Sequence, residues 1–554
     1  MEFDAVLLPH RRARMQAQGL WHDRTINDAL DACIATCPDK LALTAVQVES
    51  GKVRRFNYRE LGQMADRIAL GLRRLGVQKN DVVACQLPNW WQFTLTYLAC
   101  SRIGAVMNPL MHIFRERELS FMLQHGEAKV LIAPRSFRGF DFEGMANGLK
   151  VKLEHLQHVV IVDGQGDNSF DALLSGPSWE THADAQLLLT QQRPTPDDIT
   201  QLIYTSGTTG EPKGVMHSAN TLMANIIPYA QRLSLDAQDT ILMASPMAHQ
   251  TGFMYGLMMP IMLKASVVLQ DVWEPKQAIA LIQSEQVSFT MASTPFLTDL
   301  ARNVAEGVQG GGVGVPTLKT FLCAGAPIPG PLVEQARSAL GAKIVSAWGM
   351  SENGAVTLTQ LNDDDERSIN TDGCPLPGVE VKVVDVDGST LPTGEAGKLL
   401  LRSCSNFGGY LKRAHLNGTD ADDWFDTGDL ARLDERGYIR ITGRSKDVII
   451  RGGENIPVVE IESLLYRHPA VAQAAIVAYP DERLGERACA VVVPKPGQAL
   501  DMATLQAFMK EQQVAMQYVP EKLVVMESMP STPSGKIQKF RLRELVRDAQ
   551  DTQG

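Results

Sequence analysis

Apolar residues follow two alternating patterns along the first two thirds of the chain. Within residues 56–76 they return every three to four positions, at Leu61, Met64, Ala65, Ile68, Leu72 and Leu75. This spacing predicts a helix with one buried face. Short apolar runs of β type follow, at DVVACQL, AKVLIAP, HVVIVDG, SVVLQD, VSFTMAS and KIVSAWG. Because helix-like segments separate these runs, we predict an α/β architecture with largely parallel, buried strands.

The pattern changes after about Cys374. Residues 378–403 alternate between apolar and polar and contain an Asp-Gly turn, which is typical of antiparallel strands. A polar, glycine-bearing stretch and a second, smaller α/β pattern then run to the C-terminus. We therefore predict a large N-terminal domain over residues 1–443, with layered α/β subdomains and a β-rich part. A hinge follows at residues 444–446, and a small, mobile α+β domain covers residues 447–554.

Composition and charge exclude several classes of protein. The 554 residues are 44% hydrophobic and 21% charged, which is ordinary for a globular protein with several domain-sized units. The net charge of −10 argues against a nucleic-acid binder. No uncharged apolar run is long enough to span a bilayer, and the N-terminus lacks the order of a signal peptide, so we expect a cytoplasmic protein. The cysteines and histidines show no metal-binding spacing, and we predict no structural metal.

The stretch YTSGTTGEPKG, residues 204–214, combines glycines, hydroxyl side chains and the cation of Lys213. Free N–H groups in such a turn form an anion-binding concavity, so the stretch predicts a phosphate site. The order of residues matches neither the G-x-x-x-x-G-K-[ST] loop nor the dinucleotide G-x-G-x-x-G pattern. Residues 199–204 before it predict a short strand, which commonly precedes a phosphate-binding turn. The alternative interpretation is a flexible polar linker.

Four further clusters follow this stretch, in the order AWGMSE (347–352), WFDTGD (424–429), GRSKDVIIRGGENI (443–456) and PSTPSGK (530–536). Together the five resemble the ordered signature of the adenylate-forming, or AMP-binding, superfamily, which contains acyl-CoA synthetases, peptide-synthetase adenylation domains and luciferases. The resemblance covers essentially the whole chain. The segments RRARMQAQGLW and NWWQFTLTYLACSRIGAV are most similar in texture to bacterial medium-chain fatty acid and cyclohexanecarboxylate CoA ligases.

The resemblance implies two steps that use ATP, Mg²⁺ and coenzyme A. A carboxylate first attacks ATP to give acyl-AMP and pyrophosphate, and the coenzyme A thiol then displaces AMP. Ser206, Thr208, Thr209 and Lys213 would hold the β and γ phosphates, and Glu352 would bind Mg²⁺. The residues implied for ATP and AMP are Thr205, Ser206, Gly207, Thr208, Thr209, Gly210, Lys213, Gly325, Ala326, Trp348, Gly349, Ser351, Asp429 and Arg444.

For Asp429, Trp348 and Lys536, the chemistry of the side chain can be compared with the role that the resemblance implies. The carboxylate of Asp429 suits the two ribose hydroxyls, because each oxygen can accept a hydrogen bond. Trp348 would stack at or near adenine, or would be part of the core. Lys536, in a turn rich in Pro and Gly, resembles the lysine that bridges the acyl carboxylate and the α-phosphate; alternatively it is a solvated surface lysine.

The resemblance also implies a rotation of the small domain between the two steps. Lys446 stands at the hinge position of the family; the alternative is an ordinary exposed linker lysine. Gly452, Gly453 and Glu454 would then line the tunnel for coenzyme A, where glycine lets the backbone pass close to a ligand.

The resemblance places the acyl pocket along residues 246–260, PMAHQTGFMYGLMMP, which contain no Asp or Glu. An amino-acid substrate is therefore disfavoured, because a buried unpaired ammonium group is costly. The expected lining is His249, Phe253, Met254, Gly349 and Gly354. With Lys536, Glu352 and Lys213, His249 is also a catalytic candidate, which either gates the pocket or bonds internally. Gly349 stands where acetate-specific relatives have Trp, which would leave space for a larger acid.

These features predict an ATP-dependent acyl-CoA ligase for a medium-sized apolar acid, such as a medium-chain fatty acid or cyclohexanecarboxylate. One alternative is an acyl-AMP ligase that delivers to a carrier protein. Another is a non-catalytic, nucleotide-binding regulator, which the presence of both Lys536 and Glu352 disfavours. The sequence leaves open whether the protein is a monomer or a homodimer.

Overall fold

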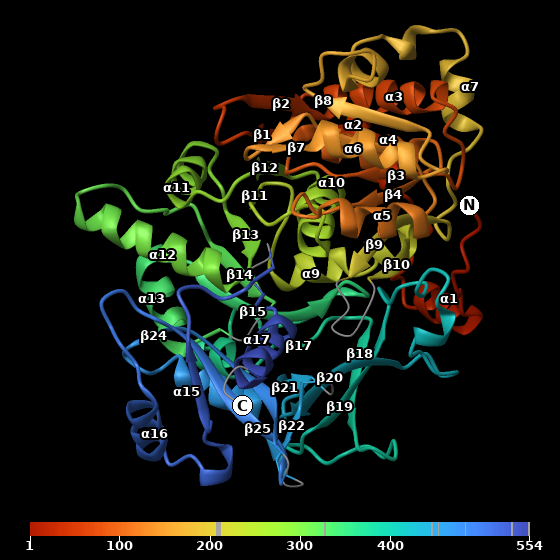
Figure 1. The fold of residues 1–554 in the computed structure, drawn as a ribbon. Coiled ribbons are helices and arrows are strands. Elements are labelled where there is room, and N and C mark those ends of the chain that lie inside the picture. The colour runs from red at the N-terminus through yellow and green to blue at the C-terminus, as the bar shows by residue number, and fades with distance from the viewer. Residues whose placement is uncertain are drawn as a thin grey trace.

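A computed structural model describes residues 1–205, 212–325, 328–444, 447–451, 454–481, 483–532 and 536–551. The described chain forms two large sheets with helices, a small antiparallel sheet and a C-terminal unit (Figure 1). The predicted class, α/β layers with a β-rich part and a smaller α+β unit, is confirmed. Among the described residues, no helix combines the length and apolar character that a bilayer crossing needs.

The first sheet has nine strands in the order β17-β16-β15-β14-β13-β11-β12-β1-β2. The six strands from β15 to β1 are parallel, whereas β16, β17 and β2 pair antiparallel at the two edges. Their bounds are β1 Leu41–Val46, β2 Val53–Asn57, β11 Thr240–Met243, β12 Ser266–Gln270, β13 Phe289–Ala292, β14 Thr320–Ala324, β15 Lys343–Met350, β16 Gly354–Leu358 and β17 Cys374–Pro375.

Helices α11 (Pro275–Ser284), α12 (Thr294–Gln309) and α13 (Gly330–Leu340) lie beside this sheet and share a hydrophobic core with it (Figure 1). α14 (Asp365–Asn370) packs on α13 and β15. The predicted parallel strands are present in the structure. Their side chains are apolar on both faces, as expected for a parallel sheet that is covered on both sides.

The second sheet has six strands in the order β10-β9-β4-β3-β5-β8, all parallel except β10. The almost wholly buried helix α4 contacts β1 of the first sheet and β3 and β4 of the second, so it joins the two layers. The strand bounds are β3 Val82–Cys85, β4 Val106–Pro109, β5 Ala128–Pro134, β8 His158–Val162, β9 Ile199–Thr205 and β10 Lys213–Ser218, beside the small pair β6 Ser136–Phe137 and β7 Phe140–Asp141.

The remaining helices of the N-terminal part surround these sheets. The predicted amphipathic helix is α3, which buries its apolar face against α2 and α4. The bounds are α1 Pro9–Ala17, α2 Ile26–Thr36, α3 Tyr58–Arg74, α4 Trp91–Arg102, α5 Glu116–His125, α6 Phe142–Lys152, α7 Ala185–Thr190, α8 Ala219–Met223, α9 Ile226–Arg232 and α10 Met259–Leu263, with the π-helical turns η1 Asp171–Ser175 and η3 Gly252–Met258 and the 3-10 turns η2 Trp179–Thr181 and η4 Ala414–Leu416.

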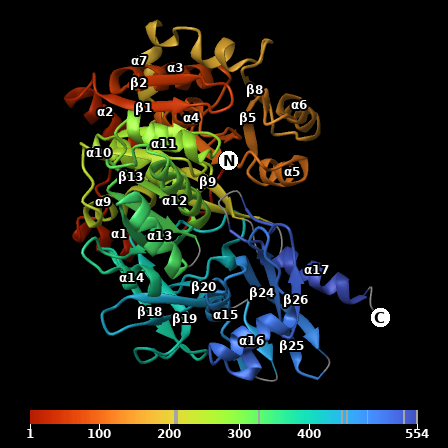
Figure 2. The ribbon, with the colours of Figure 1, turned by 90° about the vertical axis from the view of Figure 1, so that its left-hand side faces the viewer.

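The β-rich part is the antiparallel sheet β18-β19-β20-β21. The C-terminal unit, blue in Figure 2, has its own sheet of β22 to β26 and hydrophobic clusters formed only by residues from 449 onward. The bounds are β18 Val379–Val384, β19 Gly397–Ser403, β20 Phe425–Leu433, β21 Ile439–Arg444, β22 Ile449–Arg451, β23 Glu454–Ile456, β24 Val471–Asp481, β25 Gly485–Pro494, β26 Lys522–Val525, α15 Val458–Leu465, α16 Met502–Glu511, η5 Met516–Tyr518 and α17 Lys539–Asp551.

Candidate active site

The predicted phosphate stretch lies between β9 and β10, which pair antiparallel with Lys213 opposite Thr205. The described residues on both sides of the stretch thus belong to strands, and β10 begins at Lys213. The hydroxyl of Thr205 is buried and has no hydrogen-bond partner among the described residues. The Nζ of Lys213 lies 3.9 Å from the ring centre of Tyr410.

Other predicted residues fall where the structure gives no description. Ser206, Gly207, Thr208, Thr209 and Gly210 lie outside the described residues, as do Ala326, Lys446, Gly452 and Gly453. Of Glu454 only the backbone is described, as the first residue of β23. The roles predicted for these residues stay predictions.

Glu352 occupies the turn between β15 and β16 and is only 4% exposed. Its Oε1 accepts a hydrogen bond of 2.6 Å from the Tyr410 hydroxyl, and its main-chain oxygen accepts one of 2.8 Å from the Phe407 N–H. On the other side of the turn, His217 Nε2 lies 2.8 Å from the Ser351 carbonyl oxygen. Burial lowers the pKa of His217 to about 4, so its neutral ring donates from Nε2. The turn is therefore fixed from two sides.

The surroundings of Glu352 suit a divalent cation bound together with a nucleotide. Mg²⁺ is usually held by one or two carboxylates and by substrate phosphates. Among the described residues, no group of three or more His, Cys, Asp or Glu side chains could hold a metal alone. Glu352 provides one buried carboxylate close to the end of the phosphate stretch. This agrees with a Mg²⁺ ion that is held partly by the protein and partly by the phosphates of ATP.

Asp429 on β20 pairs with residues from two other strands. Its Oδ1 lies 3.0 Å from Nε of Arg444, at the end of β21, and its Oδ2 accepts a 2.9 Å hydrogen bond from the indole N–H of Trp348. Asp429 is buried, with 4% of the residue exposed. Each oxygen keeps a second lone pair, so ribose hydroxyls remain compatible with both protein contacts. The indole N–H of Trp348 is thus committed to Asp429, a contact that the sequence did not predict.

Lys536 comes from the C-terminal unit and lies beside residues of the N-terminal part. Its main-chain N–H donates to Thr532 Oγ1 at 3.0 Å. The pKa of its ammonium group is lowered to about 8, first by reduced hydration and then by the charge of Arg444, while Asp429 acts in the opposite direction. The Lys536 side chain still reaches the surface, so the charges of Arg444 and Asp429 are what link it to the nucleotide site.

His249 precedes the π-helical turn η3 and lies close to Lys536. Burial first, and the charge of Lys536 second, lower the pKa of His249 to about 4, so the imidazole is neutral at physiological pH. The Nδ1 of His249 lies 3.4 Å from the Thr251 N–H, which favours an internal hydrogen bond. Phe253 is fully buried against Tyr97 of α4, with ring centres 4.6 Å apart.

Gly349 is closely packed against β16, and its place in the acyl pocket stays a prediction. A Cβ added to Gly349 would lie 1.9 Å from the carbonyl oxygen of Gly354 on the neighbouring strand β16. A side chain at this position therefore meets backbone and not open space, and the glycine is explained by strand pairing. Gly354 behaves differently, because its added Cβ would meet Met254 Sδ at 2.7 Å and the Tyr255 hydroxyl at 3.0 Å. Gly354 and Met254 thus adjoin, and their role in lining an acyl pocket stays a prediction.

Gly325 lies directly after β14, with φ of +96° and open space around a hypothetical Cβ. It stands at the carboxyl end of a parallel strand, next to β15 with Trp348. Ligands commonly bind at this edge of α/β sheets. The described site residues thus lie on or next to β9, β10, β14, β15, β20 and β21, before η3 and before α17.

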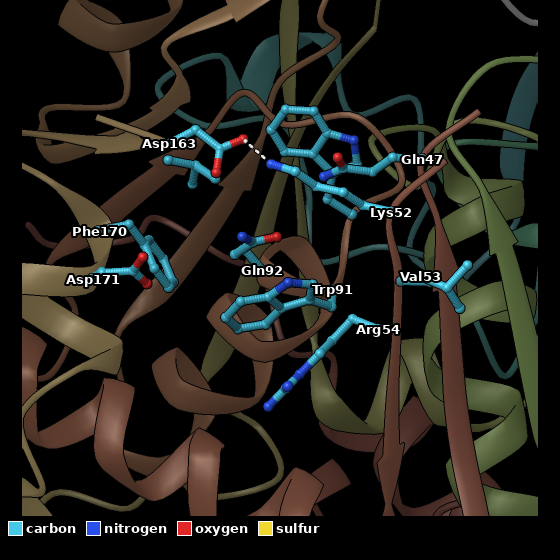
Figure 3. A pocket seen from close by; sticks show the side chains of 12 residues that line it. Gln47, Lys52, Val53, Arg54, Trp91, Gln92, Asp163, Phe170 and Asp171 are labelled. Carbon is cyan, nitrogen blue, oxygen red and sulfur yellow. Dashed lines mark ion pairs between the residues drawn. The ribbon is translucent and has the colours of Figure 1, made fainter. Parts of the chain in front are cut away.

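A cavity of about 280 Å³ is lined by other residues (Figure 3). Trp91 and Phe170 form walls beside Arg54, and an ion pair of 3.7 Å joins Lys52 and Asp163. None of the predicted site residues that the structure describes lines this cavity.

Sequence reasoning missed two residues of the site, Tyr410 and His217. Burial and the neighbouring carboxylate of Glu352 raise the pKa of Tyr410, so its hydroxyl remains a donor. His217 had a weak signal, because it directly follows the apolar pair Val215 and Met216 inside the buried strand β10. Tyr410 follows two glycines in FGGYLK and carries no comparable local signal.

Comparisons with known proteins bear on this geometry. The profile of the AMP-binding enzyme family matches residues 30–411, and that of the AMP-binding enzyme C-terminal domain matches residues 460–536. A medium-chain fatty-acid–CoA ligase of Escherichia coli (strain K12) is 38% identical and covers 96% of this chain and 92% of its own. A 2,3-dihydroxybenzoate-AMP ligase of Bacillus subtilis (strain 168) is 31% identical and covers 95% of each. The crystal structure of ATP-bound MatB from Rhodopseudomonas palustris has a TM-score of 0.83 at 27% identity, over 95% of this chain and all of that one.

Proposed function

The chain belongs to the AMP-binding enzyme family, and from this premise we propose that it is an ATP-dependent acid–CoA ligase. It would join a carboxylic acid to AMP with release of pyrophosphate, and then transfer the acyl group to the thiol of coenzyme A with release of AMP. The observation that carries the proposal is that Lys536 of the C-terminal unit lies within the electrostatic reach of Arg444, Asp429 and His249 at the candidate nucleotide site.

In the first step a carboxylate oxygen attacks the α-phosphorus of ATP, and the bond to pyrophosphate breaks. Two anions must approach, so the site has to supply positive charge. We assign Lys536 to the carboxylate and the α-phosphate, and Lys213 with the stretch 206–210 to the outer phosphates. Asp429 would bind the ribose hydroxyls. Glu352 would hold Mg²⁺, which neutralises phosphate charge when bound with ATP.

In the second step the thiol of coenzyme A attacks the acyl carbonyl carbon, and AMP leaves. The described arrangement, with Lys536 at the nucleotide site, supports the first step. The second requires Lys536 to withdraw, for which we propose a rotation at Lys446 that brings Gly452, Gly453 and Glu454 to a thiol tunnel. Such a hinge needs only a few residues to change φ and ψ.

We propose a medium-sized apolar acid as the substrate, either a medium-chain fatty acid or an alicyclic acid such as cyclohexanecarboxylate. Phe253 and Met254 are fully buried, and residues 246–260 carry no acidic group that would pair with an amino acid. The Escherichia coli relative acts on medium-chain fatty acids by its name, whereas the Bacillus subtilis relative is named an AMP ligase for an aromatic acid. The latter favours a second candidate, an acyl-AMP ligase that serves a carrier protein.

A panel of acids tests the proposal. Straight-chain acids of two to twelve carbons, benzoic acid and cyclohexanecarboxylic acid are each assayed for acid-dependent exchange of pyrophosphate into ATP. Release of AMP that depends on coenzyme A is then measured with the active acids. We expect exchange with medium-sized apolar acids and AMP release on addition of coenzyme A. Exchange without such release would favour the carrier-dependent ligase, and no exchange with any acid would contradict both.

A further inference from the structure

The N-terminal segment, residues 1–29, precedes the part of the chain that the family profile matches. It includes α1 and packs against the loop of residues 404–412, which lies between β19 and β20 and which we call the tyrosine loop because it carries Tyr410. The other side of this loop contacts Glu352, Gly214 and Lys213 of the candidate site. Its contacts therefore link a segment outside the matched region to the groups of the active site.

Arg11 of α1 is the main link. Although charged, it is only 3% exposed. Its Nη1 donates to the carbonyl oxygens of Asn406 and Phe407 at 3.0 and 3.1 Å, and its Nε donates to Oδ1 of the fully buried Asp423 at 2.8 Å. Arg14 binds the other oxygen of Asp423. A buried cation is stable only with such partners, and removing one member is costly.

Three further hydrogen bonds hold the tyrosine loop along its length. The Val6 N–H donates to the Gly408 carbonyl oxygen at 2.7 Å, and the indole N–H of Trp21 donates to the carbonyl oxygen of Cys404 at 2.9 Å. From the loop, the Lys412 N–H donates to the carboxylate of Asp4 at 3.1 Å. The N-terminal segment thus contacts the loop at its beginning, middle and end.

The inner side of the tyrosine loop contacts the candidate site. The Tyr410 hydroxyl binds Glu352 Oε1 at 2.6 Å, and the Leu411 N–H binds the Gly214 carbonyl oxygen at 2.8 Å. Gly214 follows Lys213, whose Nζ lies over the Tyr410 ring. One short loop therefore fixes the carboxylate and the strand end that carries the cation.

We propose that the N-terminal segment is a positioning element for adenylation, which holds the tyrosine loop so that Glu352 keeps the orientation needed for metal-bound ATP. This inference rests on the proposed function. Arg11 acts through the loop and touches no substrate, so it is a positioning residue. Losing the hydrogen-bond partner of a metal ligand, which for Glu352 is Tyr410, typically weakens metal affinity or activity by about 10- to 100-fold, and Arg11 supports the loop that carries this partner. Formation of the thioester from supplied acyl-AMP needs no metal-bound ATP, so loss of Arg11 should leave the rate of this step unchanged.

Arg11→Leu tests the link, with Arg12→Leu as the matched control. Arg12 lies on the same helix but pairs with Asp23 and Asp197, away from the tyrosine loop. Three quantities are measured for each variant: the Mg²⁺ concentration for half-maximal pyrophosphate exchange, the rate of thioester formation from supplied acyl-AMP, and hydrogen exchange of the amides of residues 404–412 without ligands. Tyr410→Phe, which removes only the hydroxyl, and Trp21→Phe, which removes only the indole N–H, are assayed in the same way.

We expect Arg11→Leu to raise the half-maximal Mg²⁺ concentration about tenfold, to speed amide exchange in the loop and to leave thioester formation near that of the parent. Tyr410→Phe should raise the Mg²⁺ requirement without loosening the loop, and Arg12→Leu should change none of the three. If Arg11→Leu does not fold, Trp21→Phe is expected to produce a smaller change of the same pattern. An unchanged Mg²⁺ requirement in the folded variants, or equal losses in both half-reactions, would overturn the inference. Absence of exchange in the parent protein with every acid would instead contradict the proposed function.

Discussion

The charge of Lys536 gives the adenylation step a pH dependence that arginine should abolish. The pKa of Lys536 is lowered to about 8, whereas an unperturbed lysine titrates at about 10.4. The ammonium form therefore falls from about nine tenths of the molecules at pH 7 to about one tenth at pH 9. Since the charge is lost as the pH rises through 8, kcat/KM for ATP should fall about tenfold across this range.

Bound ATP changes the expected profile in a defined direction. Phosphate charge next to the ammonium group favours its protonated form, so the fall in kcat should lie at higher pH than the fall in kcat/KM. In Lys536→Arg the side chain stays charged throughout, and the alkaline fall should disappear. The rate at pH 7 should be lower than in the parent, because the planar guanidinium has a different shape from the ammonium group.

The assay is acid-dependent exchange of pyrophosphate into ATP from pH 6 to 9.5, at several ATP concentrations and with saturating Mg²⁺. Thioester formation from supplied acyl-AMP is followed over the same range as the internal control. The reasoning would be refuted if the parent kept a constant kcat/KM up to pH 9. It would equally be refuted if Lys536→Arg showed the same alkaline fall as the parent.

Three other substitutions test separate parts of the account. Trp348→Phe removes one hydrogen bond to the Asp429 carboxylate and should raise KM for ATP about tenfold in steady-state kinetics. An unchanged KM would mean that this hydrogen bond does not contribute to ATP binding. Gly349→Ala should destabilise the fold by about 1–3 kcal/mol and lower the midpoint of thermal unfolding. Gly443→Ala is the control, because its added Cβ meets open space and should leave the midpoint unchanged. Equal unfolding midpoints for the two variants would contradict the packing argument. Lys446→Pro should retain pyrophosphate exchange but lose thioester formation from supplied acyl-AMP, because proline fixes φ. Normal thioester formation would remove Lys446 from the hinge.

Much of the N-terminal layering could be predicted from the sequence because its parallel strands are buried on both faces. The run AKVLIAP, for example, is β5 from Ala128 to Pro134 with hardly any exposed position. The strand after the phosphate stretch could not be predicted in the same way. β10 from Lys213 to Ser218 begins with a charge and two of its six residues are His217 and Ser218, so its burial becomes visible only in the paired structure.

Contacts between distant segments explain most of what the sequence did not reveal at the site. The indole N–H of Trp348 meets Asp429 only because β15 of the first sheet approaches β20 of the small sheet. Tyr410 meets Glu352 because of a loop held by residues at the other end of the chain. The tight approach at Gly349 depends on an irregularity in the pairing of β15 with β16, which periodicity does not encode. Residue type suggested the chemistry, while tertiary packing determined the partners.

The central claim is that Lys536 serves adenylation and withdraws for the second step. Lys536→Ala, assayed separately in the two half-reactions, tests it most directly. The account predicts that acid-dependent pyrophosphate exchange falls about 10²- to 10³-fold, as is common for an electrostatic group at the reacting atoms. Conversion of supplied acyl-AMP and coenzyme A to the thioester should stay near the parent rate. An equal fall in both half-reactions, or undiminished exchange, would contradict the claim.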